Sequence, residues 1–254
     1  MALRSIRWID LRKTLLSLCA LLIVTAAPAQ EAPPQSNLPD LGKPPAVPAA
    51  PRAQVQPQYA VVLDAAHGGG DVGAQFSDKL LEKDLTLGFS VRLRQALASH
   101  GIQVVTTRES DVAVPMVTRA ETANHAMAAA CLTLHATATG SGIHLFTSSL
   151  APTAYTKFLP WQSAQSAYVT QSLRLSSEIS TALGHAAVPV TLGSTSLVPM
   201  DSFACPAVAV EIAPLVGGNT TKATPLTDVG YQDRIIDALT AALMQWKNDW
   251  RQQP

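Results

Sequence analysis

Residues 61–71 of this chain read Val-Val-Leu-Asp-Ala-Ala-His-Gly-Gly-Gly-Asp. The apolar first half predicts a buried strand, and the three glycines predict a turn whose backbone can adopt positive φ values. His67 stands where the strand gives way to the turn. Open α/β sheets place their sites at the carboxyl ends of strands, so this imidazole is a candidate ligand for a metal or a substrate.

Downstream of the glycine turn, strand and helix patterns alternate, which predicts an α/β fold: a single domain with a twisted, mostly parallel sheet flanked by helices. Buried strands are expected at residues 59–64, 102–107, 131–135, 143–147 and 207–212, with a short edge strand at 188–192. A first helix is expected from Glu82 to a left-handed cap at Gly101. A second helix is expected to start at 111–115 and run to about Met127, and its inward face would carry Val117, Ala120, Ala123 and Met127. Two more are expected over 164–183 and over 228–250, and the last would turn inward Ile235, Ile236, Leu239, Leu243 and Trp246.

Three further residues take positions comparable to that of His67: Glu82 opens a helix, His135 closes a strand, and Glu211 closes another. Because the carboxyl ends of parallel strands lie on one edge, we expect these four residues to converge. Two histidines and a glutamate are a known catalytic zinc set, and a second glutamate suits a base. Taken singly, Glu82 is also explained by the helix dipole, and His135 is also explained by an ordinary hydrogen bond. Glu211 differs, because a carboxylate within an apolar run is costly to bury unless it is paired, coordinating or catalytic.

The first part of the chain predicts export. Residues 1–29 combine basic residues, a short apolar run and the sequence Ala27-Pro28-Ala29, which is typical of a cleaved signal peptide; an uncleaved anchor is the alternative. Residues 30–58 are rich in Pro, Ala and Gln and predict a linker, and residues 59–254 are enough for one domain with its own core. We therefore expect a periplasmic or secreted product with no stable membrane span after processing.

Charge and cysteine content narrow the classes of partner. The chain has 18 basic and 18 acidic residues, and without residues 1–29 it has 14 basic and 17 acidic residues. The sequence therefore lacks the excess of positive charge that is typical of nucleic-acid binding. Cys131 and Cys205 lie at the starts of predicted strands, where buried free thiols and a disulfide are both open readings. We expect a monomer, with a regulatory protein left open.

Several short motifs, in order, resemble the zinc-dependent N-acetylmuramoyl-L-alanine amidases of bacterial cell walls. They cover nearly all of residues 59–250 and comprise the strand-His-Gly-Gly start at 61–69, Glu82-Lys83-Asp84, Val104 to Arg108 with Asp111-Val112, Arg119 to Asn124, Leu134-His135-Ala136 and Pro206 to Ile212. The resemblance implies a sheet of about six strands, one zinc ion held by His67, Glu82 and His135, and Glu211 as the essential acidic residue. It implies peptidoglycan as substrate and hydrolysis of the amide between N-acetylmuramic acid and L-alanine. Arg108 and Arg119 are candidate contacts for anionic stem peptides, although Arg119 in a helix equally suits a structural ion pair.

The sequence also departs from that family. Ala65-Ala66 replaces the usual Pro-Gly, Thr137 replaces an Asp or Asn, His144 stands where a glutamate is usual, and residues 213–219 differ. Two alternatives therefore stay open: a degenerate cell-wall binding or regulatory domain, and a zinc peptidase acting on stem peptides. The stretch 148–162, with Tyr155, Phe158 and Trp161, is expected to be a loop that borders the substrate groove or packs on the sheet edge.

Overall fold

The computed structural model describes residues 59–154, 159–217 and 223–250. The predicted signal and linker segments, 1–29 and 30–58, lie outside the described residues. The strands are β1 (Ala60–Ala65), β2 (Gln75–Ser77), β3 (Leu80–Leu81), β4 (Gln103–Thr106), β5 (Ala130–Ala136), β6 (Ile143–Ser148), β7 (Val190–Thr195) and β8 (Ala207–Ile212). The helices are α1 (Glu82–Ser99), α2 (Met116–His125), α3 (Val169–His185) and α4 (Val229–Trp250), with 3-10 helices η1 (Trp161–Ala167) and η2 (Met200–Ser202).

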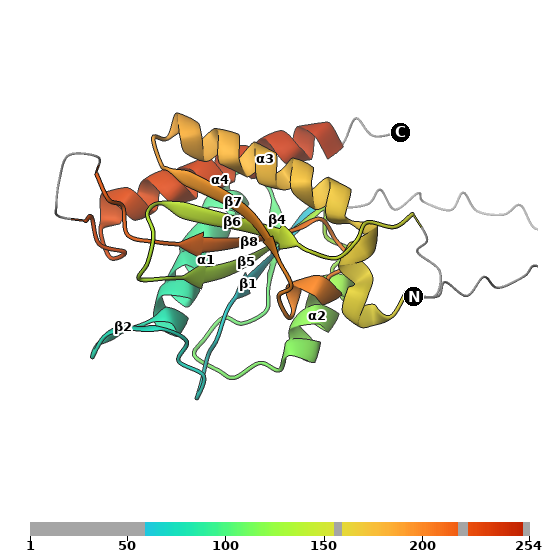
Figure 1. Cartoon of the computed structure of the whole chain (residues 1–254), viewed down its shortest axis with the longest axis horizontal. Helices are drawn as coiled ribbons and strands as arrows, with labels where there is room; N and C mark the ends of the chain where they lie inside the picture. The colour runs from blue at the N-terminus through green and yellow to red at the C-terminus, as the bar shows by residue number, and fades with distance from the viewer. Residues whose placement is uncertain (1–58, 155–158, 218–222, 251–254) are drawn as a thin grey trace, which may run out of the picture. The chain divides into compact units, whose positions relative to one another are not determined.

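Six strands form one sheet in the order β4-β1-β5-β8-β6-β7, which confirms the mostly parallel α/β fold (Figure 1). β4, β1, β5 and β8 pair in parallel, whereas β6 runs antiparallel to β8 and carries β7 in parallel beside it. The reversal has a direct consequence: the amino end of β6 lies at the edge where β1, β5 and β8 have their carboxyl ends.

The two faces of the sheet are covered unequally. α1, α3 and α4 pack on one face, in the core that holds Val61, Leu63, Leu132, Leu134, Val208 and Val210 (Figure 1). The alternate strand residues, such as Val62, Cys131 and Ala209, face a smaller core with α2 and η2. Because both faces are packed, β1 is buried along its whole length, as its unbroken apolar run predicts.

α1 follows its sequence pattern from end to end. It begins at Glu82 and buries Leu85, Phe89 and Leu93 at helical spacing. It ends at Ser99 and is followed by Gly101, whose φ is 66° and whose N–H donates to the carbonyl of Ala98, while Ile102 N–H donates to Leu97 O. These two bonds form the left-handed cap that the sequence predicted.

Other elements differ from the sequence prediction. In α2, Ala120 and Ala123 are buried as expected, but Val117 is 47% exposed because α2 turns Arg119 toward the sheet instead. Met127 is 85% exposed because α2 ends at His125, and Met127 lies beyond that end with a φ of 46°. The predicted helix 164–183 is divided into η1 and α3, and the β2–β3 hairpin and η2 were not predicted. In the stretch 148–162, residues 155–158, including Tyr155 and Phe158, lie outside the described residues, so its place beside the groove stays a prediction.

Within the described residues, no helix combines the length and apolarity that crossing a bilayer requires.

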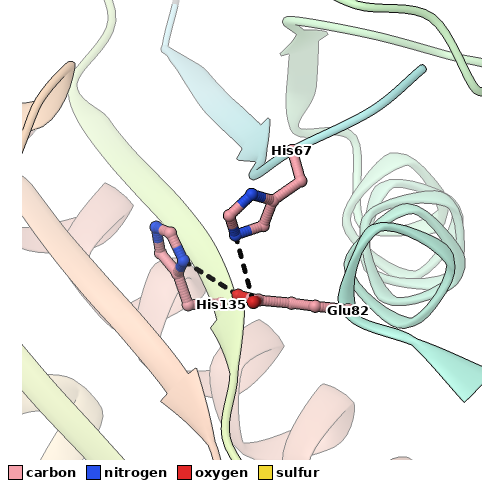
Figure 2. A group of neighbouring side chains, drawn as sticks. All are labelled: His67, Glu82 and His135. Carbon is pink, nitrogen blue, oxygen red and sulfur yellow. Dashed lines mark hydrogen bonds and ion pairs between the residues drawn. The ribbon is translucent and has the colours of Figure 1, made fainter. Parts of the chain in front are cut away.

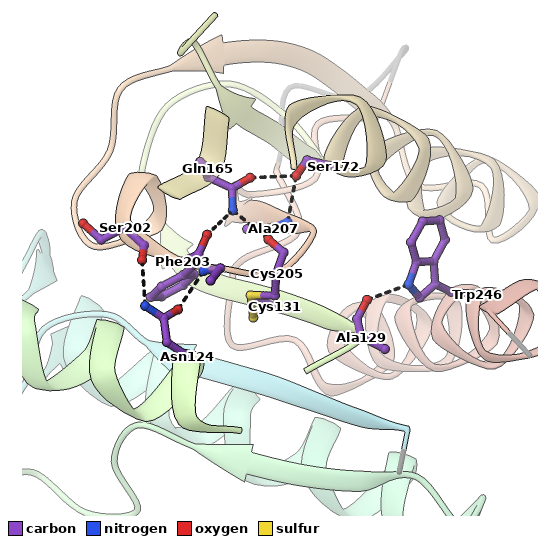
Figure 3. Close-up of a disulfide and its surroundings, with 11 residues drawn as sticks. Asn124, Ala129, Cys131, Gln165, Ser172, Ser202, Phe203, Cys205, Ala207 and Trp246 are labelled. Carbon is purple, nitrogen blue, oxygen red and sulfur yellow. Dashed lines mark hydrogen bonds between the residues drawn. A yellow bond between two sulfur atoms is a disulfide. The ribbon is translucent and has the colours of Figure 1, made fainter. Parts of the chain in front are cut away.

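Cys131 and Cys205 form a disulfide, which decides between the two readings that the sequence left open (Figure 3). The bond joins the start of β5 to the segment before β8, with the Cα atoms 6.2 Å apart. Side chains from surrounding helices fix that segment: Asn124 donates to Ser202 O, and Gln165 donates to the carbonyls of Phe203 and Cys205. The disulfide therefore lies at the amino edge of the sheet, opposite the carboxyl ends of β5 and β8.

Replacing both Cys131 and Cys205 by alanine is expected to lower the free energy of unfolding by about 2–4 kcal/mol. The bond spans 74 residues of sequence, so its loss frees a long loop in the unfolded chain. Urea unfolding of the variant and of reduced and oxidised wild-type protein measures the effect and separates it from the loss of buried sulfur. Equal stability of the oxidised and reduced proteins would contradict the prediction.

Candidate metal centre

His67 lies in a turn that only particular residues can form. Its φ is 64°, and the φ of Gly68 is 130°. A Cβ at Gly68 would lie 2.3 Å from the carbonyl oxygen of Val112, so that position accepts only glycine. His67 Nδ1 donates to Asp71 Oδ2 at 2.9 Å, while Nε2 lies 3.1 Å from Glu82 Oε2. The hydrogen bond from Nδ1 to Asp71 orients the ring and leaves Nε2 available as a ligand.

Two buried arginines hold this turn through hydrogen bonds. Arg119 donates to Asp64 Oδ1 at 2.7 Å and to backbone oxygens within residues 65–67, and Arg108 donates to backbone oxygens of the same turn and of Lys83. Arg119 thus forms the ion pair that was one of its two expected roles. Contact with a stem peptide, the other expectation for both residues, requires exposed side chains, but Arg108 is 4% and Arg119 2% exposed. In this structure, the hydrogen bonds of both side chains hold the turn.

Glu82 connects the two histidines. Its Oε1 lies 3.0 Å from His135 Nδ1 and accepts a hydrogen bond from the N–H of Ala136, while Oε2 faces His67 and accepts one from the N–H of Ala74. Burial raises the pKa of Glu82, but the hydrogen bonds from His135, Ala74 and Ala136 and the charge of His67 outweigh burial and lower this pKa to about 2. Glu82 is therefore an anion at neutral pH, although it is only 5% exposed.

His67, Glu82 and His135 converge as the sequence predicted (Figure 2). They come from the turn after β1, the first residue of α1 and the end of β5, yet their ligand atoms all lie within 4.8 Å of one another. The two imidazole rings meet edge to face, with centroids 5.6 Å apart. Two neutral imidazoles and one carboxylate suit a zinc ion, and three protein ligands leave a position open. The residues present therefore fit the metal that the family resemblance implies.

Glu211 lies one strand away from this group. Its Cα is paired in register with His135 on β5 and with His144 on β6. Although residues 208–210 before it are buried, the Glu211 side chain is 30% exposed, and it accepts a hydrogen bond from His144 Nδ1 at 2.7 Å. Beside it lies a cavity of about 250 Å³ lined by His135, Phe146, Thr195, Leu197, Ala209 and Glu211. A ligand in this cavity would contact both the candidate metal centre and the Glu211 carboxylate.

The supporting roles of three residues, Asp71, Gly73 and Lys83, were not identified from the sequence. Asp71 orients His67, and Lys83 links the turn to Asp111 by donating to Gly69 O and to Asp111 Oδ2. The hydrogen bond from Lys83 lowers the pKa of Asp111. Gly73 has a φ of 64° and packs against the ligands themselves. The only available signal was their position close to motif residues, and that signal does not specify contacts.

The Gly73→Ala substitution is expected to weaken metal binding by about tenfold or more. A Cβ at Gly73 would lie 2.6 Å from both Glu82 Oε2 and His67 Cδ2, so two candidate ligands would have to move apart. Titration with zinc, followed by isothermal calorimetry, measures the change.

Gly70→Ala is the matched control, because among the described residues, apart from Gly70 and its two chain neighbours, no atom lies within 4 Å of a Cβ built at Gly70. Its zinc affinity should match that of the wild type. Equal affinities for Gly73→Ala and Gly70→Ala would show that close packing at Gly73 has no part in the metal centre.

The chain is an α/β protein whose two-histidine, one-glutamate candidate metal centre lies at the carboxyl edge of a mostly parallel sheet. A family model described as N-acetylmuramoyl-L-alanine amidase matches residues 61–245, which is more than half of the chain. The chain therefore belongs to the N-acetylmuramoyl-L-alanine amidase family.

Individual relatives agree with this assignment. The amidase AmiA of Escherichia coli K12 is 32% identical over 105 residues, 39% of this chain and 36% of the relative. The germination-specific amidase of Bacillus subtilis 168 is 51% identical over 51 residues, 20% of this chain and 21% of the relative. The chain thus spans about a third or less of these two curated relatives.

Solved structures show the same fold. The catalytic domain of the amidase CwlV from Bacillus (Paenibacillus) polymyxa var. colistinus matches with a TM-score of 0.58 at 18% identity, over 75% of this chain and 99% of that domain. An amidase from Clostridium difficile 630 matches with a TM-score of 0.58 at 21% identity, over 76% of this chain and 98% of that one.

Proposed function

We propose that this protein hydrolyses the amide bond between N-acetylmuramic acid and L-alanine in peptidoglycan, with one zinc ion held by His67, Glu82 and His135. The observation that carries the proposal is the convergence of these three side chains, with ligand atoms within 4.8 Å of one another, beside the Glu211 carboxylate. Membership of the amidase family supports the choice of bond.

Each residue has a distinct part in this reaction. When bound, zinc supplies Lewis-acid chemistry, which acidifies water and polarises the scissile carbonyl group. Glu211 takes a proton from the attacking water and delivers it to the nitrogen of the leaving amine as the C–N bond breaks. Asp71 keeps the His67 ring in place, and Arg108 and Arg119 hold the turn that carries His67.

The cavity beside Glu211 gives the substrate a place to bind. Phe146, Leu197 and Ala209 form an apolar wall, and Thr195 adds a hydroxyl group. A volume of about 250 Å³ holds one or two small residues. We place the first residues of the stem peptide there, with the scissile amide between the cavity and the metal centre.

Digestion of isolated sacculi by zinc-loaded and zinc-stripped protein tests the proposed function. Mass spectrometry of the products should show stem peptides with new L-alanine amino termini and glycan strands with free lactyl carboxylates, only in the zinc-loaded sample. Cleavage within isolated stem peptides instead would favour the zinc peptidase. Tight binding to sacculi without any cleavage would favour the degenerate binding or regulatory domain.

We also propose that the protein is exported, with cleavage after residue 29 and a periplasmic or secreted mature form. The support is the basic flank, the short apolar run and the small residues at 27–29. Sequencing the amino terminus of the protein made in cells tests this. A mature protein that begins at Met1 would instead indicate an anchor.

A further inference from the structure

His144 lies beside Glu211 although the two residues are far apart in sequence. β6 runs antiparallel to β8, and the register pairs His144 with Glu211, which is itself paired with His135 on β5. Side chains at paired positions project from the same face of a sheet, so His135, Glu211 and His144 form a row across three strands. At one end of this row is the candidate metal centre, and at the other is an imidazole with no part in it.

The hydrogen bond between His144 and Glu211 has a defined direction. His144 Nδ1 lies 2.7 Å from Glu211 Oε2, and an ionised carboxylate can only accept. His144 Nδ1 must therefore carry the proton, which fixes the tautomer of a neutral ring. Within the described part of the chain, Glu211 Oε1 makes no hydrogen bond, so one carboxylate oxygen is held while the other is open to a ligand.

The surroundings of His144 hold its ring in place. Gly140, with a φ of 85°, lies so close that a Cβ there would be 2.4 Å from both Cε1 and Nε2 of the ring. Phe146 meets the ring edge to face, at a centroid distance of 6.5 Å. The loop that carries Gly140 is itself fixed, because Gly142 N–H donates to Pro214 O and Ala213 N–H donates to Gly142 O. The imidazole thus has little freedom to leave Glu211.

We infer that His144 is a positioning residue for Glu211: its Nδ1–H holds one carboxylate oxygen so that the other faces the attacking water. The inference rests on the proposed function, because positioning has meaning only if Glu211 acts as the base. A free carboxylate rotates about its last side-chain torsion, whereas a base is effective only within hydrogen-bond distance of the proton that it accepts. His144 supplies this constraint from a strand that carries none of the three candidate metal ligands.

Two substitutions separate hydrogen bonding from simple filling of space. His144→Leu keeps much of the volume and removes the donor, so kcat should fall by about 10- to 100-fold, with KM and zinc content unchanged. His144→Asn places an amide nitrogen as many bonds from Cα as Nδ1, and it should restore kcat to within about threefold of the wild type. His185→Leu, on an exposed histidine at the end of α3, is the matched control and should leave the rate unchanged.

A double-mutant cycle shows whether His144 acts through Glu211. In the Glu211→Gln background, His144→Leu should cause no further loss of rate, because the carboxylate that it positions is absent. Additive losses, or His144→Asn as slow as His144→Leu, would overturn the inference. A wild-type rate for His144→Leu would also overturn the inference. That result would leave the proposed function intact, because the wild-type enzyme would still be active.

The hydrogen bond itself can be observed without any activity. Long-range ¹H–¹⁵N NMR of histidine-labelled protein should show His144 protonated at Nδ1. The loss of the resonance in His144→Asn assigns it to His144. In Glu211→Leu, the preference of His144 for protonation at Nδ1 should be lost. A His144 ring protonated only at Nε2 would overturn the inference. A wild-type zinc protein that shows the Nδ1–H resonance but releases no peptide would refute the proposed function, and the positioning role with it.

Discussion

Replacing Glu211 by glutamine is expected to lower the rate of amide hydrolysis by about 10²- to 10⁴-fold while the protein keeps its zinc. Glutamine preserves the shape of the side chain but cannot take a proton from water at neutral pH. Because Glu211 lies on β8, one strand away from His135 and outside the group of three converging ligand atoms, the metal should remain bound.

Peptide release from sacculi and zinc content, measured on the same preparation, check this expectation. Glu121→Gln, at an exposed position on α2, is the control for loss of a carboxylate elsewhere. A Glu211→Gln protein that retains the wild-type rate would exclude Glu211 as the base. One that loses its zinc would instead make Glu211 a ligand.

Removal of any one of the three predicted ligands is expected to abolish both zinc binding and activity. His67→Ala and His135→Ala each delete one nitrogen donor, and Glu82→Ala deletes the carboxylate that lies between them. Two remaining donors leave the metal with too few protein ligands for a stable catalytic site. Added zinc should therefore recover little of the rate.

Zinc analysis after gel filtration measures the loss, and far-UV circular dichroism shows whether the fold is kept. Glu82 is buried, so Glu82→Gln accompanies the alanine variant as a replacement that keeps the volume and retains an acceptor for one of the two N–H groups, that of Ala74 or that of Ala136. If Glu82→Ala keeps both zinc and rate, Glu82 is only an acidic residue in the first turn of a helix, and the three-ligand model is wrong.

The sequence predicted the parts of this protein that hydrophobic periodicity controls. α1 begins at Glu82 and ends before the glycine cap at Gly101, as expected, because apolar spacing and capping residues both act locally. The meeting of His67, Glu82 and His135 followed from one topological rule: parallel strands end on one edge.

The rest depended on contacts that periodicity does not encode. Burial patterns identify β6 as a strand but do not give its direction, so the sequence did not place His144 against Glu211. In α2, the buried ion pair of Arg119 with Asp64 sets the rotation of the helix, and Val117 was therefore wrongly expected to face inward. The same limitation left the pairing of Cys131 and Cys205 undecided until the strand order was known.

Locating the zinc ion in a crystal structure tests the proposed three-ligand site. Anomalous diffraction at the zinc absorption edge, from crystals of the zinc-loaded protein, should reveal one ion about 2.0–2.2 Å from the nearest donor atoms of His67, Glu82 and His135. No comparable peak is expected beside Glu211 and His144. Zinc bound between those two residues, or no ordered ion among His67, Glu82 and His135, would contradict the three-ligand site.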